Sequence, residues 1–294
     1  MSSPKTVSDA RLFLIGCGTP TPTPERFGSC LVLKVGKEHL MFDCGPASTY
    51  KMLRLGIFPT TISHLFFTHH HYDHNADYPC FLLCRWDHER EDVPRLKIYG
   101  PPPTEMITQR LIGPEGAFVD DWRARVEHPA SQEVYAARGG QVPRPAPSYD
   151  IEEISKGSQM TTKKCQITAG RAIHLQPMMD CLTYRVDWGQ GSVVITGDTG
   201  RHSDVEELAR DATTFVVNVW DHQNNMSTTL LSGFCGTIDA AEMAAGAGVQ
   251  RLVITHQGPN LSRPGSREKA VADMASIFKG EIIFGEEFLA LDLD

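Results

Sequence analysis

The stretch LFFTHHHYDHNADYP, residues 65–79, decides the fold, because four histidines and two aspartates follow an apolar run within nine residues. In an extended segment alternate side chains share a face, so His69 and His71 point one way and His70 the other. If the chain then turns, Asp73 and His74 reach the same cavity. The segment therefore predicts a metal-binding pattern, His-x-His-x-Asp-His, in which His70 packs behind the sheet.

Three later apolar runs also end in a potential metal ligand. RAI leads to His174, VVITG leads to Asp198, and LVIT leads to His256. Side chains at the ends of neighbouring strands can converge on one edge of a sheet, where α/β proteins commonly place their sites. Imidazole and carboxylate without thiolate suit zinc or a similar divalent ion.

The rest of the chain alternates strand and helix patterns, which predicts an α/β protein. Strands are expected over residues 11–16 and on both sides of a turn at residues 35–37, and a capping-box pattern, Ser203 to Glu206, predicts a helix. With 294 residues, 41% of them hydrophobic, we expect a single domain over 1–294. Residues 101–150, rich in Pro and Gly, predict an irregular excursion that serves as a lid or subunit contact.

Bulk composition limits the partners. The net charge is −8 and the Lys and Arg residues are scattered, which makes a nucleic-acid partner unexpected. The N-terminal apolar run is far shorter than the roughly 20 residues of a membrane span, so we expect a soluble, cytoplasmic protein with no membrane association. Eight dispersed cysteines indicate reduced, mostly interior thiols, and Cys80 and Cys84 are expected to face the core.

The ligand pattern resembles the metallo-β-lactamase superfamily, whose signature is this motif followed by a distant His, Asp and His. The resemblance implies an αββα sandwich and two divalent metal ions, zinc first, with Mn²⁺ or Fe²⁺ as alternatives. One ion would be held by His69, His71 and His174, and the other by Asp73, His74 and His256. Asp198 would bridge the two.

Within the superfamily, GCGTPTPTPERFGSCLVL, FDCG, GDTG and AAEMAAGAGVQRLVITHQGP resemble the ribonuclease Z branch. Three departures weaken the match to tRNA processing. Asn218 and Val219 stand where that branch has a His-Glu pair that assists proton transfer, FDCGPAST lacks the usual continuation after Gly45, and no basic Gly- and Pro-rich arm is visible. We therefore expect a small-molecule substrate and regard nucleic acid as an unlikely one.

The expected chemistry is hydrolysis of a small ester, lactone or related bond. Two cations about 3.5–4 Å apart would polarise the substrate and lower the pKa of bound water to roughly 7, which supplies a metal-bound hydroxide. Asp73 is the expected catalytic residue, because it can orient this hydroxide or pass a proton to the leaving group. The alternatives are a ribonuclease Z-like phosphodiesterase or nuclease and an iron-dependent oxidoreductase on the same fold.

Four residues outside the ligand set are candidates for the site. His222 could replace the missing proton donor or be an ordinary surface histidine. Tyr72 and His202 could contact the substrate at the cavity mouth, and Arg26 could bind an anionic group or brace its loop. Relatives in this branch often dimerise, so we also expect a homodimer.

Overall fold

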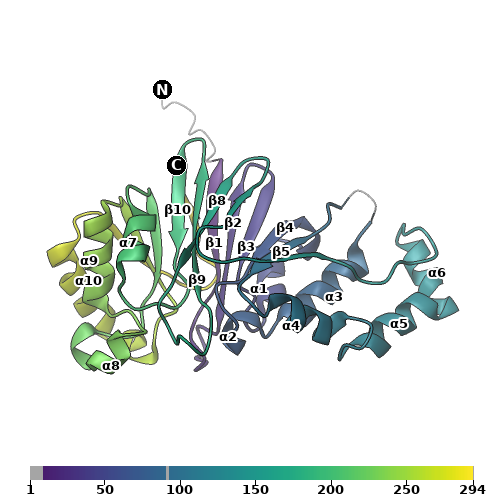
Figure 1. The fold of residues 1–294 in the computed structure, drawn as a ribbon, viewed down its shortest axis with the longest axis horizontal. Helices are drawn as coiled ribbons and strands as arrows, with labels where there is room; N and C mark the ends of the chain where they lie inside the picture. Colours follow the sequence, from purple (N-terminus) through teal and green to yellow (C-terminus); the bar gives the residue numbers. More distant parts are fainter. Residues whose placement is uncertain (1–8, 91–92, 294) are drawn as a thin grey trace.

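Two seven-stranded sheets packed face to face form the centre of the molecule, and helices cover both outer faces (Figure 1). The structure is a computed structural model that describes residues 9–90 and 93–293. Residues 1–8, which belong to the N-terminal segment discussed above, lie outside the described residues. The arrangement confirms the αββα sandwich expected from the ligand pattern.

The first sheet has the strand order β14-β1-β2-β3-β4-β5-β6. Its strands are β1 (Ala10–Cys17), β2 (Ser29–Val35), β3 (Glu38–Phe42), β4 (Ile62–Phe66), β5 (Lys97–Gly100), β6 (Asp150–Glu153) and β14 (Ala290–Asp292). Strands β2 and β3 form the hairpin expected around residues 35–37, and β3, β4, β5 and β6 run parallel. Aromatic rings stack across this parallel part, with the Phe42 and Phe66 centroids 5.2 Å apart.

The second sheet has the order β13-β12-β11-β10-β9-β8-β7. Its strands are β7 (Gln159–Thr161), β8 (Gln166–Arg171), β9 (Leu182–Trp188), β10 (Gly191–Ile195), β11 (Thr214–Asn218), β12 (Arg251–Thr255) and β13 (Glu281–Phe284). Strands β10 to β13 are parallel, and β8 lies antiparallel to β9, which is antiparallel to β10. The carboxyl ends of β8, β10, β11 and β12 therefore meet at one edge.

The helices are placed by the apolar faces that they bury. They are α1 (Ser48–Arg54), α2 (Tyr72–Asn75), α3 (Tyr78–His88), α4 (Thr104–Ile112), α5 (Val119–Glu127), α6 (Pro129–Ala137), α7 (Ser203–Ala209), α8 (Thr228–Leu231), α9 (Thr237–Ala247) and α10 (Ser266–Ile277). Buried residues of α1, α3 and α4 pack with the outer face of the first sheet, and those of α7, α9 and α10 pack with the second. A third cluster fills the space between the sheets. None of the helices in the described residues combines the length and apolar character that a membrane crossing needs.

Residues 101–150 are not irregular, because they contain α4, α5 and α6. Figure 1 shows α5 and α6 beyond the edge of the sandwich, on the side opposite α9 and α10. Neither α5 nor α6 has a buried residue. Both therefore lack the buried apolar stripe from which a helix is usually predicted. We call residues 104–144 the helical arm.

The expectation that Cys80 and Cys84 face the core is wrong. Cys80 is exposed and Cys84 is half-buried, with their sulfur atoms 3.9 Å apart on α3. The core-facing positions of this helix are taken by larger side chains such as Phe81, Leu82 and Trp86. The other six cysteines are buried free thiols, as expected.

Candidate metal centre

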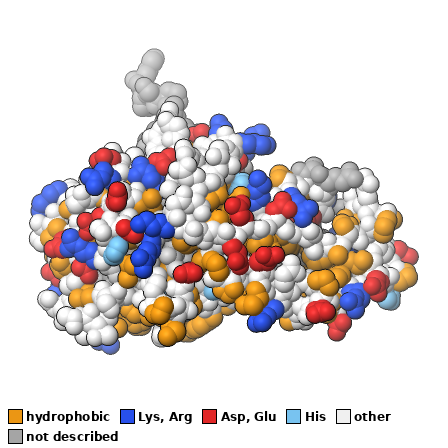
Figure 2. Space-filling model, in the orientation of Figure 1, with side chains coloured by type: hydrophobic (Ala, Val, Ile, Leu, Met, Phe, Trp, Pro, Cys, Tyr) orange, Lys and Arg blue, Asp and Glu red, His pale blue; other side chains and the backbone are white. Residues whose placement is uncertain are grey.

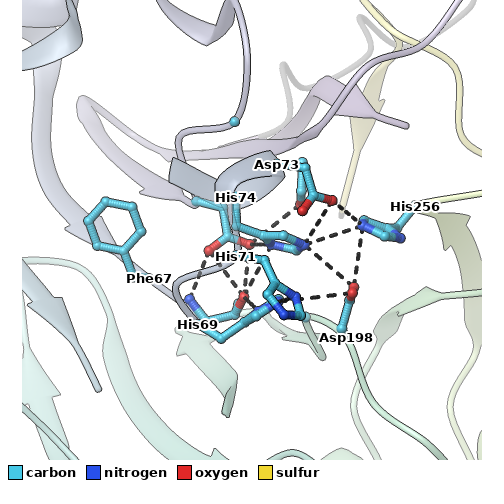
Figure 3. A network of polar contacts seen from close by, with 12 residues as sticks. Phe67, His69, His71, Asp73, His74, Asp198 and His256 are labelled. Carbon is cyan, nitrogen blue, oxygen red and sulfur yellow. Dashed lines mark hydrogen bonds and ion pairs between the residues drawn. The ribbon is translucent and has the colours of Figure 1, made fainter. Parts of the chain in front are cut away.

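The predicted ligands come together at the carboxyl ends of strands from both sheets (Figure 3). His69 and His71 follow β4, and Asp73 and His74 lie on α2. His174, Asp198 and His256 follow β8, β10 and β12. Segments separated by more than a hundred residues thus supply one buried site.

Three histidines form the first group. Nε2 of His69 lies 3.0 Å from Nδ1 of His71, and Nε2 of His174 lies 3.4 Å from the same Nδ1. His70 points away, with its Nε2 2.8 Å from the Thr104 hydroxyl and 3.2 Å from the carbonyl oxygen of Pro101. Alternation along the segment therefore separates the three consecutive histidines as predicted.

The second group contains Asp73, His74 and His256. Nε2 of His256 lies 3.2 Å from Nε2 of His74 and 3.0 Å from Oδ2 of Asp73. All three side chains are buried. Their ligand atoms lie within 4.8 Å of one another, as do those of the first group together with Asp198.

Asp198 stands between the two groups. Its Oδ1 lies 3.5 Å from Nε2 of both His74 and His256, and its Oδ2 lies 3.6 Å from Nε2 of His174. One oxygen thus faces each group, which is the arrangement that a bridging carboxylate needs. Burial alone would raise the pKa of Asp198, but the charges of His256 and His74 hold it well below its ordinary value.

Three arguments indicate that these histidine and aspartate side chains are suited to binding metal ions. First, ring nitrogens of neutral histidines that face one another repel unless a proton or cation lies between them. Second, Oδ1 of Asp73 is buried without a hydrogen-bond partner among the described residues. Third, burial lowers the pKa of His69 well below its ordinary value, and burial also lowers that of His71, so both rings favour the neutral form that binds metal.

Asp43, in the FDCG segment after β3, holds the ligands in place. Its Oδ2 lies 2.7 Å from Nδ1 of His74, and its Oδ1 accepts hydrogen bonds from the backbone N–H of Thr68 at 2.8 Å and the Thr68 hydroxyl at 3.1 Å. A carboxylate on the far nitrogen of a metal-binding histidine fixes its tautomer and orientation. This role of Asp43 was not predicted from the sequence, although a carboxylate directly after a strand was a visible signal.

Around the site, backbone segments pack closely against one another, and two residues adopt strained backbone conformations. A Cβ on Gly45 would come within 2.1 Å of the Asp73 carbonyl oxygen, so only glycine lets FDCG pack against the ligand-bearing turn. Asp43 and His256 both adopt positive φ, 60° and 49°, which costs free energy for residues other than glycine. Such strain persists only where surrounding contacts dictate it.

Two further contacts orient ligands of the second sheet. Nδ1 of His174 donates to the carbonyl oxygen of Gly233 at 2.7 Å, which leaves its Nε2 for the site. Asn218 donates from Nδ2 to Oδ1 of Asp198 at 2.6 Å. The residue that stands in place of the expected histidine therefore holds the Asp198 carboxylate in position.

Of the four candidate residues outside the ligand set, His222 and His202 contact α10 and α7, and Arg26 and Tyr72 contact loops near the site. His222 is buried, with Nε2 2.7 Å from the Ser266 hydroxyl of α10, and it makes no described contact with a ligand. His202, rather than Ser203, caps α7, because its side chain accepts from the Asp204 N–H. This cap holds His202 at the start of that helix.

Arg26 and Tyr72 brace the loop between β1 and β2. Nη1 of Arg26 donates to Oε1 of Gln257 at 3.1 Å, next to the ligand His256, and Nη2 also donates to Ser262. The Tyr72 hydroxyl donates to the carbonyl oxygen of Pro20 at 2.6 Å, while 54% of the side chain remains exposed. The bracing role considered for Arg26 is the one that its contacts show.

The αββα sandwich with its two ligand groups defines a metal-dependent hydrolase of the metallo-β-lactamase fold. Residues 39–257, more than half of the chain, match the model of the beta-lactamase superfamily domain, so the chain belongs to this family. The resemblance to its ribonuclease Z-like branch is confirmed as well. A protein called Ribonuclease Z from Mycolicibacterium gilvum (strain PYR-GCK) is 28% identical over 281 residues, which cover 93% of each chain.

Other known proteins agree with this assignment. A Ribonuclease Z from Mycobacterium avium (strain 104) is 29% identical over 96% of this chain and 97% of its own. Among solved structures, the fold is shared with the metallo-beta-lactamase fold protein YhfI from Bacillus subtilis, at 18% identity, a TM-score of 0.71, and coverage of 96% and 98%. It is also shared with the short form of human tRNase Z, at 18% identity, a TM-score of 0.68, and coverage of 97% and 98%.

These relatives correct two expectations from the sequence. A small ester or lactone as substrate, and nucleic acid as an unlikely partner, are both wrong, because proteins named Ribonuclease Z match along nearly the whole chain. The differences from the ribonuclease Z branch that led to those expectations lie around the metal ligands. They are the residues at 218 and 219, the continuation after FDCG, and the missing basic Gly- and Pro-rich arm. The ligand set itself, which determines the chemistry, matches that of the branch.

Proposed function

We propose that this protein is a metal-dependent phosphodiesterase that cleaves RNA. The observation that carries the proposal is the pair of buried ligand groups joined by Asp198, since two-metal sites stabilise both the attacking and leaving oxygens of a phosphodiester displacement. The relatives named Ribonuclease Z support RNA as the substrate. None of the proteins described above is named an oxidoreductase, so nothing favours the iron-dependent alternative.

Two divalent ions would be held by the residues already described. His69, His71 and His174 would bind one, Asp73, His74 and His256 the other, and Asp198 both. When bound, such ions polarise the phosphoryl oxygens and lower the pKa of a bound water. We propose zinc, because the donor set consists of imidazole and carboxylate, with Mn²⁺ or Fe²⁺ as the alternatives.

Asp73 is the residue that we propose for proton transfer. Its Oδ2 contacts Nε2 of His256, and a carboxylate has two oxygens, so one oxygen can hold a metal ion while the other accepts a proton from the attacking water. The same carboxyl can return that proton to the oxygen that leaves when the P–O bond breaks. Asn218 cannot supply a proton in this way, and it serves instead to hold Asp198.

Cleavage of a labelled precursor tRNA and of a short single-stranded RNA tests the proposal. We expect metal-dependent cleavage of at least one of them, which disappears when a chelator removes the metal and returns when Zn²⁺ or Mn²⁺ is added back. Rapid hydrolysis of aryl esters or lactones, with neither RNA cleaved at any metal concentration, would refute it.

Three broader expectations from the sequence stay predictions. They are a single domain over residues 1–294, a homodimer, and a cytoplasmic location. Sedimentation at several protein concentrations tests the homodimer, because a dimer of this chain has twice the mass of 32.6 kDa.

A further inference from the structure

Two aromatic side chains lie directly beside the metal ligands, and the reaction described above does not use them. Trp220 and Phe234 line the same small cavity as Asp198, Asn218 and His256. Both aromatic residues are half-buried, so each retains accessible surface. At a site bordered by polar ligands, accessible aromatic surface is available to a substrate.

The two aromatic residues hold a defined position. The backbone N–H of Trp220 donates to the carbonyl oxygen of Cys235 at 2.9 Å, which joins the segment after β11 to the segment before α9. On the other side, a Cβ on Gly258 would come within 1.9 Å of the Trp220 carbonyl oxygen, so Gly258 packs tightly against it. Trp220 is thus fixed between two neighbouring loops.

The rings of Trp220 and Phe234 pack against each other, and Phe234 in turn packs against the candidate ligand His174. The Trp220 and Phe234 centroids are 5.5 Å apart at 54°, and the Phe234 and His174 centroids are 4.7 Å apart at 81°. These separations are typical of favourable aromatic pairs. The indole N–H of Trp220 has no acceptor within residues 9–90 and 93–293, so no internal hydrogen bond holds this ring.

The net charge of the protein does not favour RNA binding. The chain carries a net charge of −8, and Figure 2 shows Lys, Arg, Asp and Glu intermixed on the face in view. A chain of net negative charge gains little, taken as a whole, from phosphate neutralisation, which is the usual source of nucleic-acid affinity. Short-range contacts close to the metal centre must contribute more of the binding.

We propose that Trp220 and Phe234 form a stacking surface for one unpaired nucleobase of the RNA, next to the phosphate that is cleaved. This inference rests on the proposed function, because it assumes that the substrate is a nucleic acid. Every base has a flat π-face, so stacking tolerates different sequences and contributes about 1–3 kcal/mol per base. A base can reach the surface only when it is unpaired, so the enzyme prefers single-stranded or frayed RNA ends to an intact duplex.

A binding experiment tests the stacking surface without requiring cleavage. Metal-free protein is titrated with a fluorescently labelled seven-residue RNA and with a series of the same strand, each lacking one base at a successive position. We expect one position at which base removal raises Kd by about 5- to 150-fold, which is the stacking free energy expressed as a ratio. In Trp220→Leu this discrimination between the intact and abasic strands falls to near one.

Matched variants separate stacking from a folding defect. Trp220→Phe, which keeps an aromatic ring, retains part of the discrimination, and Phe234→Leu reduces it. Phe58→Leu, at an exposed aromatic residue outside the cavity with 59% of its surface accessible, leaves it unchanged. Equal Kd values for intact and abasic strands in the wild type, or undiminished discrimination in Trp220→Leu, would overturn the inference.

Metal reconstitution of the same proteins distinguishes this inference from the proposed function. If the wild type discriminates between intact and abasic strands but cleaves none of them with metal, the proposed phosphodiesterase activity fails while the stacking surface stands. If it cleaves all strands and binds them equally, the stacking surface fails and the activity stands.

Discussion

The metal centre and the helical arm are built in opposite ways. The centre gathers buried side chains from both sheets, and nearly every ring nitrogen and carboxylate oxygen in it has a close partner. In the helical arm, α4 packs against the first sheet, whereas α5 and α6 have no buried residue and this part of the arm is joined to α3 by ion pairs. The centre is therefore determined by many contacts at once, whereas the positions of α5 and α6 depend on a few.

The anchor of the arm is Asp87 on α3. Its carboxylate pairs with Arg125, Arg138 and Arg144, and the two shortest of these contacts measure 2.8 and 2.9 Å. The Arg144 guanidinium also lies 3.6 Å from the centre of the Trp86 ring, and Arg144 is buried. Substitutions in the centre should therefore change metal binding and chemistry, and substitutions in the anchor should change stability alone.

The largest effect is expected for Asp73→Asn. The amide keeps the size of the side chain but cannot accept the proton from water, so kcat for RNA cleavage should fall by about 10²–10⁴. Steady-state kinetics on the short RNA measure it. Asp77→Asn, four residues further on, removes a carboxylate that accepts from the Thr49 N–H and makes no described contact with a ligand, and it should keep most of the activity.

A smaller effect is expected for Asp43→Asn. The variant loses the carboxylate that holds Nδ1 of His74, and loss of such a partner lowers metal affinity by about 10- to 100-fold. Competition with a chelating dye measures the affinity. Unchanged affinity in a folded Asp43→Asn protein would show that the strained FDCG segment has no part in holding the metal.

The pH dependence of metal binding is expected to follow His74. Burial disfavours its charged form, but the carboxylates of Asp43 and Asp198 raise its pKa well above the ordinary value. The raised pKa favours the protonated ring when no metal is bound, so we expect metal binding to release a proton. Apparent affinity should rise about tenfold per pH unit below this pKa. Calorimetry in buffers of different ionisation enthalpy counts the protons, and proton uptake would contradict the assignment.

The smallest effect on the site is expected for Arg144→Ala in the anchor of the arm. Loss of the contacts with Trp86 and Asp87 should lower the free energy of unfolding by about 1–2 kcal/mol, with metal content unchanged. Urea unfolding measures the loss. Arg123→Ala, at an exposed position of α5, should change stability by no more than about 0.5 kcal/mol. Loss of metal from Arg144→Ala would show that the two regions are coupled.

The same contrast explains what could be predicted from the sequence. Metal binding admits few residue types, and candidate ligands at strand ends are visible as apolar runs that stop at His or Asp, so these residues and the position of His70 could be predicted from the sequence. Their division into two groups came from the resemblance to the metallo-β-lactamase superfamily. Asp43 was missed because a carboxylate that supports a histidine has no spacing rule. The arm was missed because α5 and α6 bury no apolar stripe.

Substrate class was the least predictable property. The residues that suggested a small molecule, Asn218 and Val219 among them, surround the ligands without altering them. Asn218 proved to hold Asp198, which could not be foreseen because Asn218 ends β11 whereas Asp198 lies in the loop after β10, and no spacing rule links them. Cys80 and Cys84 were misplaced for a simpler reason, since a four-residue spacing says that two residues share a face of a helix and not which face is buried.

The metal content of the protein decides whether two groups of ligands, joined by Asp198, hold two ions. Elemental analysis should compare wild-type protein with His70→Ala and His71→Ala after reconstitution and removal of free metal. We predict two ions per chain in the wild type, close to two in His70→Ala, and a clear loss in His71→Ala. Well under one ion per chain in the wild type, or a loss in His70→Ala as large as that in His71→Ala, would contradict the account.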